Sequence, residues 1–134
     1  MPPVSQAPPA QARRSFWHSL GVALRGARRV LATEPNAQIE AAIALLAVGL
    51  ALWLKISPVE WALLVTLIAL VLGLEMVNTA IEAAVDLACP EQHPLAKKAK
   101  DSAAGAVVLA AIASVAVGVV IFLPRLWLVV KNFL

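Results

Sequence analysis

The 134-residue sequence has little of the polar content of a soluble enzyme, since charged residues make up only 14% of it. Cys89 is its only cysteine, which excludes an intrachain disulfide and a multi-cysteine metal site. The sequence also contains neither G-x-x-x-x-G-K-[ST] nor G-x-G-x-x-G, so the two common glycine-rich phosphate loops are absent. Any chemistry in this chain must therefore rest on another arrangement of side chains.

Apolar residues dominate instead, at 61% of the chain with a mean hydropathy of +0.85, against roughly 45–50% apolar residues in soluble domains. They form tracts at 39–54, 59–85 and 103–130. A helix needs about 20 residues to cross a bilayer, which the first tract reaches only with its polar flanks. We predict an all-α membrane protein with transmembrane helices at about 36–56, 58–86 and 98–130. Three spans enclose little interior, so an oligomer is expected.

The residues before the first span predict a helix on the membrane surface. Between 13 and 32 the apolar side chains recur on one helical face, and Arg25 and Arg29 lie opposite. Such a helix suits the interface of an anionic leaflet, although packing against a partner protein would produce the same pattern. Residues 1–12 are rich in proline and alanine and are expected to form a disordered tail, which leaves 13–134 as the membrane domain.

The distribution of lysine and arginine predicts the orientation. Eight of these residues precede the first span or lie in the second loop, and three lie elsewhere. The eight are Arg13, Arg14, Arg25, Arg28, Arg29, Lys97, Lys98 and Lys100, and the three are Lys55, Arg125 and Lys131. The positive-inside rule places the N-terminus and second loop in the cytoplasm and the C-terminus outside. Trp53, Trp61 and Trp127 then fall at the outer interface, where tryptophan is enriched.

Polar side chains follow the apolar part of the second span on one helical face. Glu75, Asn78, Glu82 and Asp86 are spaced i, i+3, i+7 and i+11, so their directions fall within about 80° of one another. Glu75 lies about 24 Å along the helix from Val59. In a hydrocarbon core of roughly 30 Å this is near the cytoplasmic edge, whereas transporters usually place their coupling carboxylates near the midplane. The position therefore suits a group held at the interface, such as a lipid headgroup.

The second loop adds a basic stretch, HPLAKKAKD at 93–101, where the third span begins. Carboxylates that hold Mg²⁺ beside lysines that hold phosphates suit phosphoryl transfer. Spacing alone leaves two other interpretations open. One is a small multispan transporter with Glu75 as proton carrier, and the other is a polar seam between subunits.

Two motifs carry a family resemblance. E-M-V-N-T-A-I-E-A-A-V-D at 75–86 and H-P-L-A-K-K-A-K-D-S-A-A-G-A-V at 93–107 resemble the small bacterial diacylglycerol kinase / undecaprenol kinase family. The second motif and I-F-L-P-R-L at 121–126 are more similar to the undecaprenol kinases of Gram-positive type. Glu40, in contrast, resembles the diacylglycerol-type members at its position. Undecaprenol is therefore the expected acceptor, with diacylglycerol as the alternative.

The resemblance implies a homotrimeric membrane kinase that moves the γ-phosphate of ATP to a lipid hydroxyl at the cytoplasmic face of the cell membrane, in sites shared between subunits. It implies that Glu75 contacts the lipid as general base and that Glu34 and Glu82 hold Mg²⁺. Asn78 would order the site around Glu75, and Lys100 would bind phosphate. The residues implied in nucleotide binding are Glu34, Asn78, Glu82, Asp86, Glu91, His93, Lys100 and Asp101. Membrane lipid, ATP and further copies of the chain are the expected partners, and nucleic acid is not.

Overall fold

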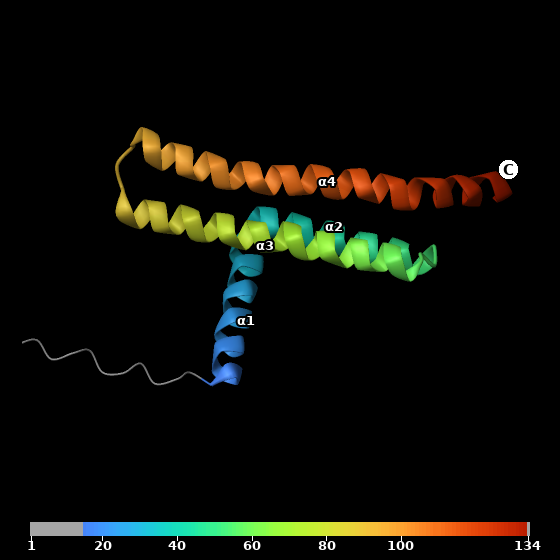
Figure 1. Cartoon of the computed structure of the whole chain (residues 1–134), viewed down its shortest axis with the longest axis horizontal. Helices are drawn as coiled ribbons and strands as arrows, with labels where there is room; N and C mark the ends of the chain where they lie inside the picture. The colour runs from blue at the N-terminus through green and yellow to red at the C-terminus, as the bar shows by residue number, and fades with distance from the viewer. Residues whose placement is uncertain (1–14, 134) are drawn as a thin grey trace, which may run out of the picture.

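The computed structural model describes residues 15–133, which fold into four α-helices joined by short turns (Figure 1). These are α1 (Phe16–Thr33), α2 (Pro35–Trp53), α3 (Pro58–Ala88) and α4 (Pro94–Phe133). The last three are long and apolar enough to cross a membrane. The prediction of an all-α chain with one helix followed by three spans is therefore confirmed. The predicted tail at 1–12 lies outside the described residues.

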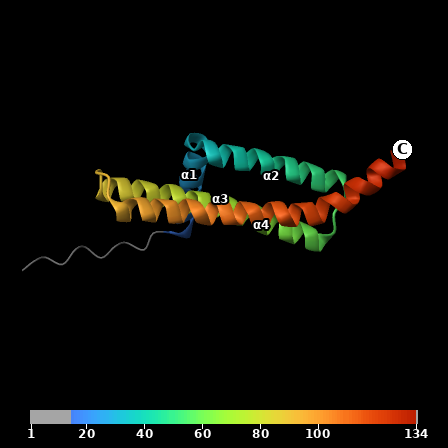
Figure 2. The same ribbon diagram turned by 90° about the horizontal axis from the view of Figure 1, so that it is seen from above.

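The long helices α3 and α4 run antiparallel as a hairpin, and α2 packs beside them (Figures 1 and 2). In Figure 1, α1 stands crosswise to this bundle at the start of α2, and the α3–α4 hairpin continues past it to the 89–93 loop. If α2, α3 and α4 cross the membrane, the axis of α1 lies along the membrane surface. The loop then lies on the side of α1 that faces away from the bilayer.

The turn between α2 and α3 ends the first span earlier than predicted. The Lys55 N–H donates to the carbonyl oxygen of Leu52 and the Ile56 N–H to that of Ala51, both at 3.3 Å, which is the pattern of a Schellman motif. Lys55 adopts the left-handed conformation that this motif requires, with φ 50°. Ile56 therefore leaves the helix and packs into the hydrophobic core with Ala51, Leu64 and Ile121. This core lies at the opposite end of α3 from the 89–93 loop.

Prolines set the helix starts. Pro35, Pro58 and Pro94 each begin a helix, where the missing proline N–H leaves no hydrogen bond unmade. For this reason α4 begins at Pro94, within the HPLAKKAKD stretch that was expected to open the third span. A further proline, Pro124, lies inside α4, and the C-terminal part of that helix bends in Figure 2, as expected where a proline interrupts the hydrogen bonds of a helix.

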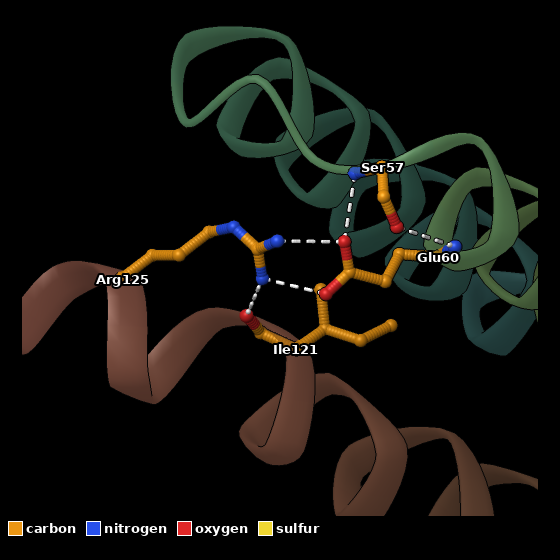
Figure 3. A network of polar contacts seen from close by, with 4 residues as sticks. All are labelled: Ser57, Glu60, Ile121 and Arg125. Carbon is orange, nitrogen blue, oxygen red and sulfur yellow. Dashed lines mark hydrogen bonds and ion pairs between the residues drawn. The ribbon is translucent and has the colours of Figure 1, made fainter.

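An ion pair joins α3 to α4 beside the hydrophobic core (Figure 3). Arg125 donates from Nη1 and Nη2 to the two carboxylate oxygens of Glu60, at 2.6 and 2.7 Å. Glu60 also accepts from the Ser57 N–H at 2.7 Å as part of a capping box, and Arg125 donates to the Ile121 carbonyl at 2.9 Å. Both side chains of the pair are largely covered, at 31% and 22% exposed. The pair therefore holds α3 and α4 in one register.

We expect Glu60→Gln to lower the free energy of unfolding by about 1–3 kcal/mol, because it leaves the Arg125 guanidinium without its charged partner. Thermal unfolding in detergent micelles measures this loss. The double variant Glu60→Gln/Arg125→Gln should lose less free energy of unfolding than the sum of the losses in the two single variants, because substitutions of residues in contact are not additive. Lys131→Gln is the control, since Lys131 is exposed and forms no ion pair among the described residues. Strictly additive losses would contradict the interaction.

Candidate active site

The predicted stripe on α3 passes from buried to exposed toward the end of the helix. Glu75 and Asn78 are buried, with 3% and 8% of their surface exposed, although they are polar. Glu82 is half-buried and Asp86 is exposed. Asn78 Nδ2 donates to Glu82 Oε1 at 3.3 Å, so the amide and the carboxylate one turn apart share a face, as the spacing predicted. Burial of a carboxylate and an amide costs free energy unless hydrogen bonds, a charge partner or a metal compensate, so buried polar groups of this kind are candidates for a functional site.

A further carboxylate comes from another part of the chain. Glu34 lies between α1 and α2, where Thr33 Oγ1 donates to its Oε1 at 3.2 Å. The junction lies beside α3, since both α1 and α2 contact that helix. The structure therefore gathers the three carboxylates that were assigned to base and metal roles, from α3 and from the α1–α2 junction.

Glu40 lies near the same set of carboxylates, although the predicted site residues did not include it. It lies on α2 within electrostatic range of Glu75, and its Oε2 is buried with no hydrogen-bond partner in the part of the chain that the structure describes. The sequence signal was its position just inside the predicted cytoplasmic mouth of the first span. A buried carboxylate oxygen without a partner marks a place for a donor, a proton or a cation.

The gathered side chains suit a magnesium ion. Mg²⁺ usually takes one or two protein carboxylates and completes its shell with water and phosphate oxygens, a role that Glu34 and Glu82 can fill. Asn78 Oδ1 is buried and lacks a donor within residues 15–133, so the site also offers a neutral oxygen. The same residues contain no group of three or more His, Cys, Asp or Glu positioned for a metal. A magnesium ion held by Glu34 and Glu82 would take its other ligands from water and phosphate oxygens.

A cavity of about 700 Å³ opens where α3 ends and α4 begins. Five of the predicted nucleotide residues line it, namely Asp86, Glu91, His93, Lys100 and Asp101. The remaining three, Glu34, Asn78 and Glu82, do not line it. They are connected to it through α3, because Glu82 and Asp86 are one helical turn apart on the same face. The predicted residues thus fall into two adjoining sets, one around the carboxylates Glu34 and Glu82 and one that lines the cavity.

Ion pairs and a helix cap order the cavity wall. Lys100 Nζ pairs with Asp86 across the loop, and Lys97 Nζ pairs with Asp101 on α4. His93 Nδ1 accepts from the Leu95 N–H at 3.2 Å, which fixes its ring at the start of α4 and leaves Nε2 free of this bond. Asp86 is thus an exposed residue near the end of α3 that pairs with the predicted phosphate-binding lysine.

Lys100→Gln should raise KM for ATP about tenfold, because one charge-assisted hydrogen bond to phosphate contributes about 1.5–3 kcal/mol. Asp86→Asn should raise it less than about threefold, since exposed ion pairs contribute about 0–1 kcal/mol. Steady-state kinetics with varied ATP measure both. Lys98→Gln is the matched control, because Lys98 is exposed and lies outside the cavity wall. An effect of Asp86→Asn as large as that of Lys100→Gln would mean that Asp86 contacts the nucleotide itself.

Comparison with known proteins assigns this site to a family. The family profile described as prokaryotic diacylglycerol kinase matches residues 21–122. This segment contains the carboxylates Glu34, Glu75 and Glu82 and the residues that line the cavity. The chain belongs to the prokaryotic diacylglycerol kinase family. The resemblance found in the two motifs is thus confirmed, and the chain is a lipid kinase. The kinase assignment favours phosphoryl transfer over transport or a structural seam, and the roles of the stripe residues stay predictions.

Individual members of the prokaryotic diacylglycerol kinase family are similar over most of the chain. The undecaprenol kinase of Bacillus subtilis (strain 168) is 43% identical over 111 residues, which cover 83% of this chain and 90% of that protein. The diacylglycerol kinase of Synechocystis sp. is 38% identical over 85% of this chain and 70% of that protein. The diacylglycerol kinase of Escherichia coli (strain K12) is 37% identical over 71% of this chain and 78% of that protein.

Proposed function

We propose that this chain is an undecaprenol kinase, which transfers the γ-phosphate of ATP to the hydroxyl of undecaprenol at the cytoplasmic face of the cell membrane. The observation that carries the proposal is the 43% identity to the Bacillus undecaprenol kinase across 90% of that protein. The Gram-positive-type motifs at 93–107 and 121–126 support it. Diacylglycerol is the second candidate acceptor, favoured by the Synechocystis and Escherichia relatives and by Glu40.

The positions of the side chains support a division of roles. Glu75 takes the proton of the lipid hydroxyl, since it is a buried carboxylate on α3 whose distance along the helix predicts a place near the headgroups. Lys100, in the cavity beyond it, binds phosphate. Glu34 and Glu82 would hold Mg²⁺, which when bound neutralises charge on the phosphates. Asn78 orients the Glu82 carboxylate through the hydrogen bond from Nδ2.

We further propose that three copies assemble and that the N-terminus and the 89–93 loop face the cytoplasm. Few apolar side chains are buried among residues 15–133, and large ones on α2 and α4, such as Leu45, Leu46 and Val120, are more than 70% exposed. Lipid or other subunits must cover these surfaces. The excess of basic residues before α2 and at the start of α4 supports the orientation. A native mass of three chains in a lipid nanodisc tests the assembly.

A panel of acceptor lipids tests the proposed substrate. Purified protein in mixed micelles receives γ-labelled ATP with undecaprenol, with diacylglycerol, or with a long-chain methyl ether that lacks a hydroxyl. We expect kcat/KM for undecaprenol to exceed that for diacylglycerol at least about tenfold, a difference of about 1.4 kcal/mol in transition-state binding, and no transfer to the ether. Equal rates with the two alcohols would contradict the choice of undecaprenol, and no transfer to either would contradict the kinase assignment.

A further inference from the structure

A second cavity lies between the three long helices. This cavity, here called the apolar groove, has a volume of about 380 Å³ and is lined by residues of α2, α3 and α4. Among the residues that the structure describes, Glu40 is the only charged one in its wall, and Ser114 is the only other polar one. Ser114 Oγ donates to the Ala110 carbonyl oxygen at 2.8 Å, so its hydroxyl already has a partner. A wall of this composition favours a hydrocarbon occupant over water.

One end of the apolar groove lies beside the proposed base. Because α2 and α4 run opposite to α3 (Figure 1), Glu40 and Leu72 line one end, and Leu50 and Phe122 line the other. Leu72 precedes Glu75 by three residues on α3, which is about 4.5 Å along the helix axis. An alcohol whose hydroxyl lies at Glu75 can therefore extend its hydrocarbon chain into the groove.

The apolar groove is open toward the outside of the bundle. Ile43 and Leu46 on α2 and Val115 on α4 line it, and they are 60%, 74% and 67% exposed. With the three helices in a bilayer, a lipid chain can therefore enter the groove sideways while its headgroup stays at the membrane surface.

The length of the apolar groove limits how much chain it holds. The wall on α2 extends from Glu40 to Leu50, a distance of about 15 Å at 1.5 Å per residue. An isoprene unit adds about 4–5 Å of extended chain, since carbon–carbon bonds are about 1.5 Å long. The groove therefore accommodates only the part of a long polyprenol chain that follows the hydroxyl.

A glycine keeps the end of the groove near Phe122 open. Gly118 is the only glycine in the wall within the described part of the chain, and a Cβ atom at this position would lie 4.0 Å from Phe122 Cδ2. A methyl group is therefore in ordinary contact there, whereas a longer side chain would occupy the groove itself. Glycine inside a helix is destabilising relative to alanine, a cost that use of this space by a ligand would explain.

We propose that the apolar groove binds the first three or four isoprene units of the acceptor alcohol, about 15 Å of chain, and that Gly118 is a specificity-determining residue for this methyl-branched chain. The rest of a longer polyprenol stays in the bilayer and is not recognised. The proposal rests on the proposed polyprenol kinase function and adds which part of the acceptor the protein recognises.

A panel of isoprenoid alcohols tests how much of the chain is bound. The full-length protein in mixed micelles receives γ-labelled ATP with geraniol, geranylgeraniol or undecaprenol, each at the same mole fraction. We expect kcat/KM to rise at least about tenfold from geraniol to geranylgeraniol, because contacts in an apolar pocket discriminate by about 10- to 200-fold, and to rise less than about threefold from there to undecaprenol. A steady rise across all three alcohols would overturn the proposal and leave the undecaprenol kinase function intact. No transfer to any of them would overturn both.

Substitution of Gly118 tests whether the groove is the source of this dependence. Gly118→Leu should lower kcat/KM for geranylgeraniol at least about tenfold and leave KM for ATP unchanged. Gly49→Leu is the matched control, because Gly49 is exposed, lies outside the groove wall and has no atom within 4 Å of the position of a Cβ. An equal loss in the two variants, or no loss in Gly118→Leu, would overturn the proposal.

Photolabelling tests the site without measuring activity. Geranylgeraniol with a diazirine on its third isoprene unit should label peptides from 43–50 and 111–122 of the wild-type protein, and excess undecaprenol should reduce the labelling at least about tenfold. This result does not depend on the folding of any variant. Labelling confined to other peptides would overturn the proposal. So would labelling that undecaprenol does not reduce, which would mean that bulk lipid or a second copy of the chain fills the groove.

Discussion

Replacing Glu75 with glutamine is expected to reduce phosphoryl transfer by about 10²- to 10⁴-fold, the usual contribution of a general base. The carboxylate is 97% covered (3% exposed), and glutamine has nearly the same shape, so the substitution removes the proton acceptor without opening a cavity. The protein should therefore fold, and the phosphate-binding side chains of the cavity should be undisturbed.

Three measurements separate the roles of Glu75. Transfer of labelled phosphate at saturating lipid and ATP reports the chemical step, equilibrium dialysis reports ATP binding, and thermal unfolding reports folding. Glu75→Asp is the matched variant, because it keeps a carboxylate but withdraws it by one methylene, and it should retain more activity than Glu75→Gln. A Glu75→Gln protein with the wild-type rate would refute the base assignment. Loss of ATP binding in that variant would indicate a role in the nucleotide site instead.

Periodicity predicted the parts of this site that lie on one helix. The shared face of the stripe and the contact of Asn78 with Glu82 follow from i, i+3 and i+4 spacing, which any regular helix imposes, whereas the burial of Glu75 and Asn78 depends on how the helices pack. The rise per residue also predicts a position for Glu75 near one edge of the hydrocarbon core, which stays a prediction. The same reasoning located the spans, since an apolar tract of sufficient length has few alternatives to a membrane helix.

Contacts between distant residues did not follow from spacing. The pair of Glu60 and Arg125 joins residues 65 positions apart, and neither side chain belongs to a motif that names the other. The pair of Asp86 and Lys100 depends on how the 89–93 loop turns α4 back along α3. The family resemblance suggested Glu34, but only the fold shows it near Glu75, because the angle between α1 and α2 brings it there.

The ends of the helices were the least predictable feature. The predicted end of the first span, at about 56, came from the length that a membrane helix needs, because the apolar tract itself ends at 54. The chain instead leaves the helix through Lys55 in the left-handed conformation, which lysine adopts less readily than glycine. The burial of Ile56 in the core compensates for that conformation. Tertiary packing, which local sequence does not encode alone, therefore decided where α2 ends.

The Mg²⁺ dependence of the reaction should change most when Glu82 is altered. Removing a metal ligand should raise the Mg²⁺ concentration for half-maximal rate by about 10- to 100-fold, since even the outer-shell partners of metal ligands contribute that much. Glu82 also accepts a hydrogen bond from Asn78, so an alanine variant alone would mix two effects. Glu82→Gln retains an oxygen that can accept this bond and removes only the charge.

The comparison of Glu82→Gln with Glu82→Ala separates the two effects. If Glu82 binds the metal, both variants need more Mg²⁺, and a high Mg²⁺ concentration restores part of the rate in each. If Glu82 only positions Asn78, Glu82→Gln behaves like the wild type and Glu82→Ala loses activity at every Mg²⁺ concentration. Titration of the rate with Mg²⁺, together with dialysis of Mn²⁺ in the presence of ATP, distinguishes these results. An unchanged Mg²⁺ dependence in both variants would remove Glu82 from the metal site and leave Glu34 as its only assigned ligand.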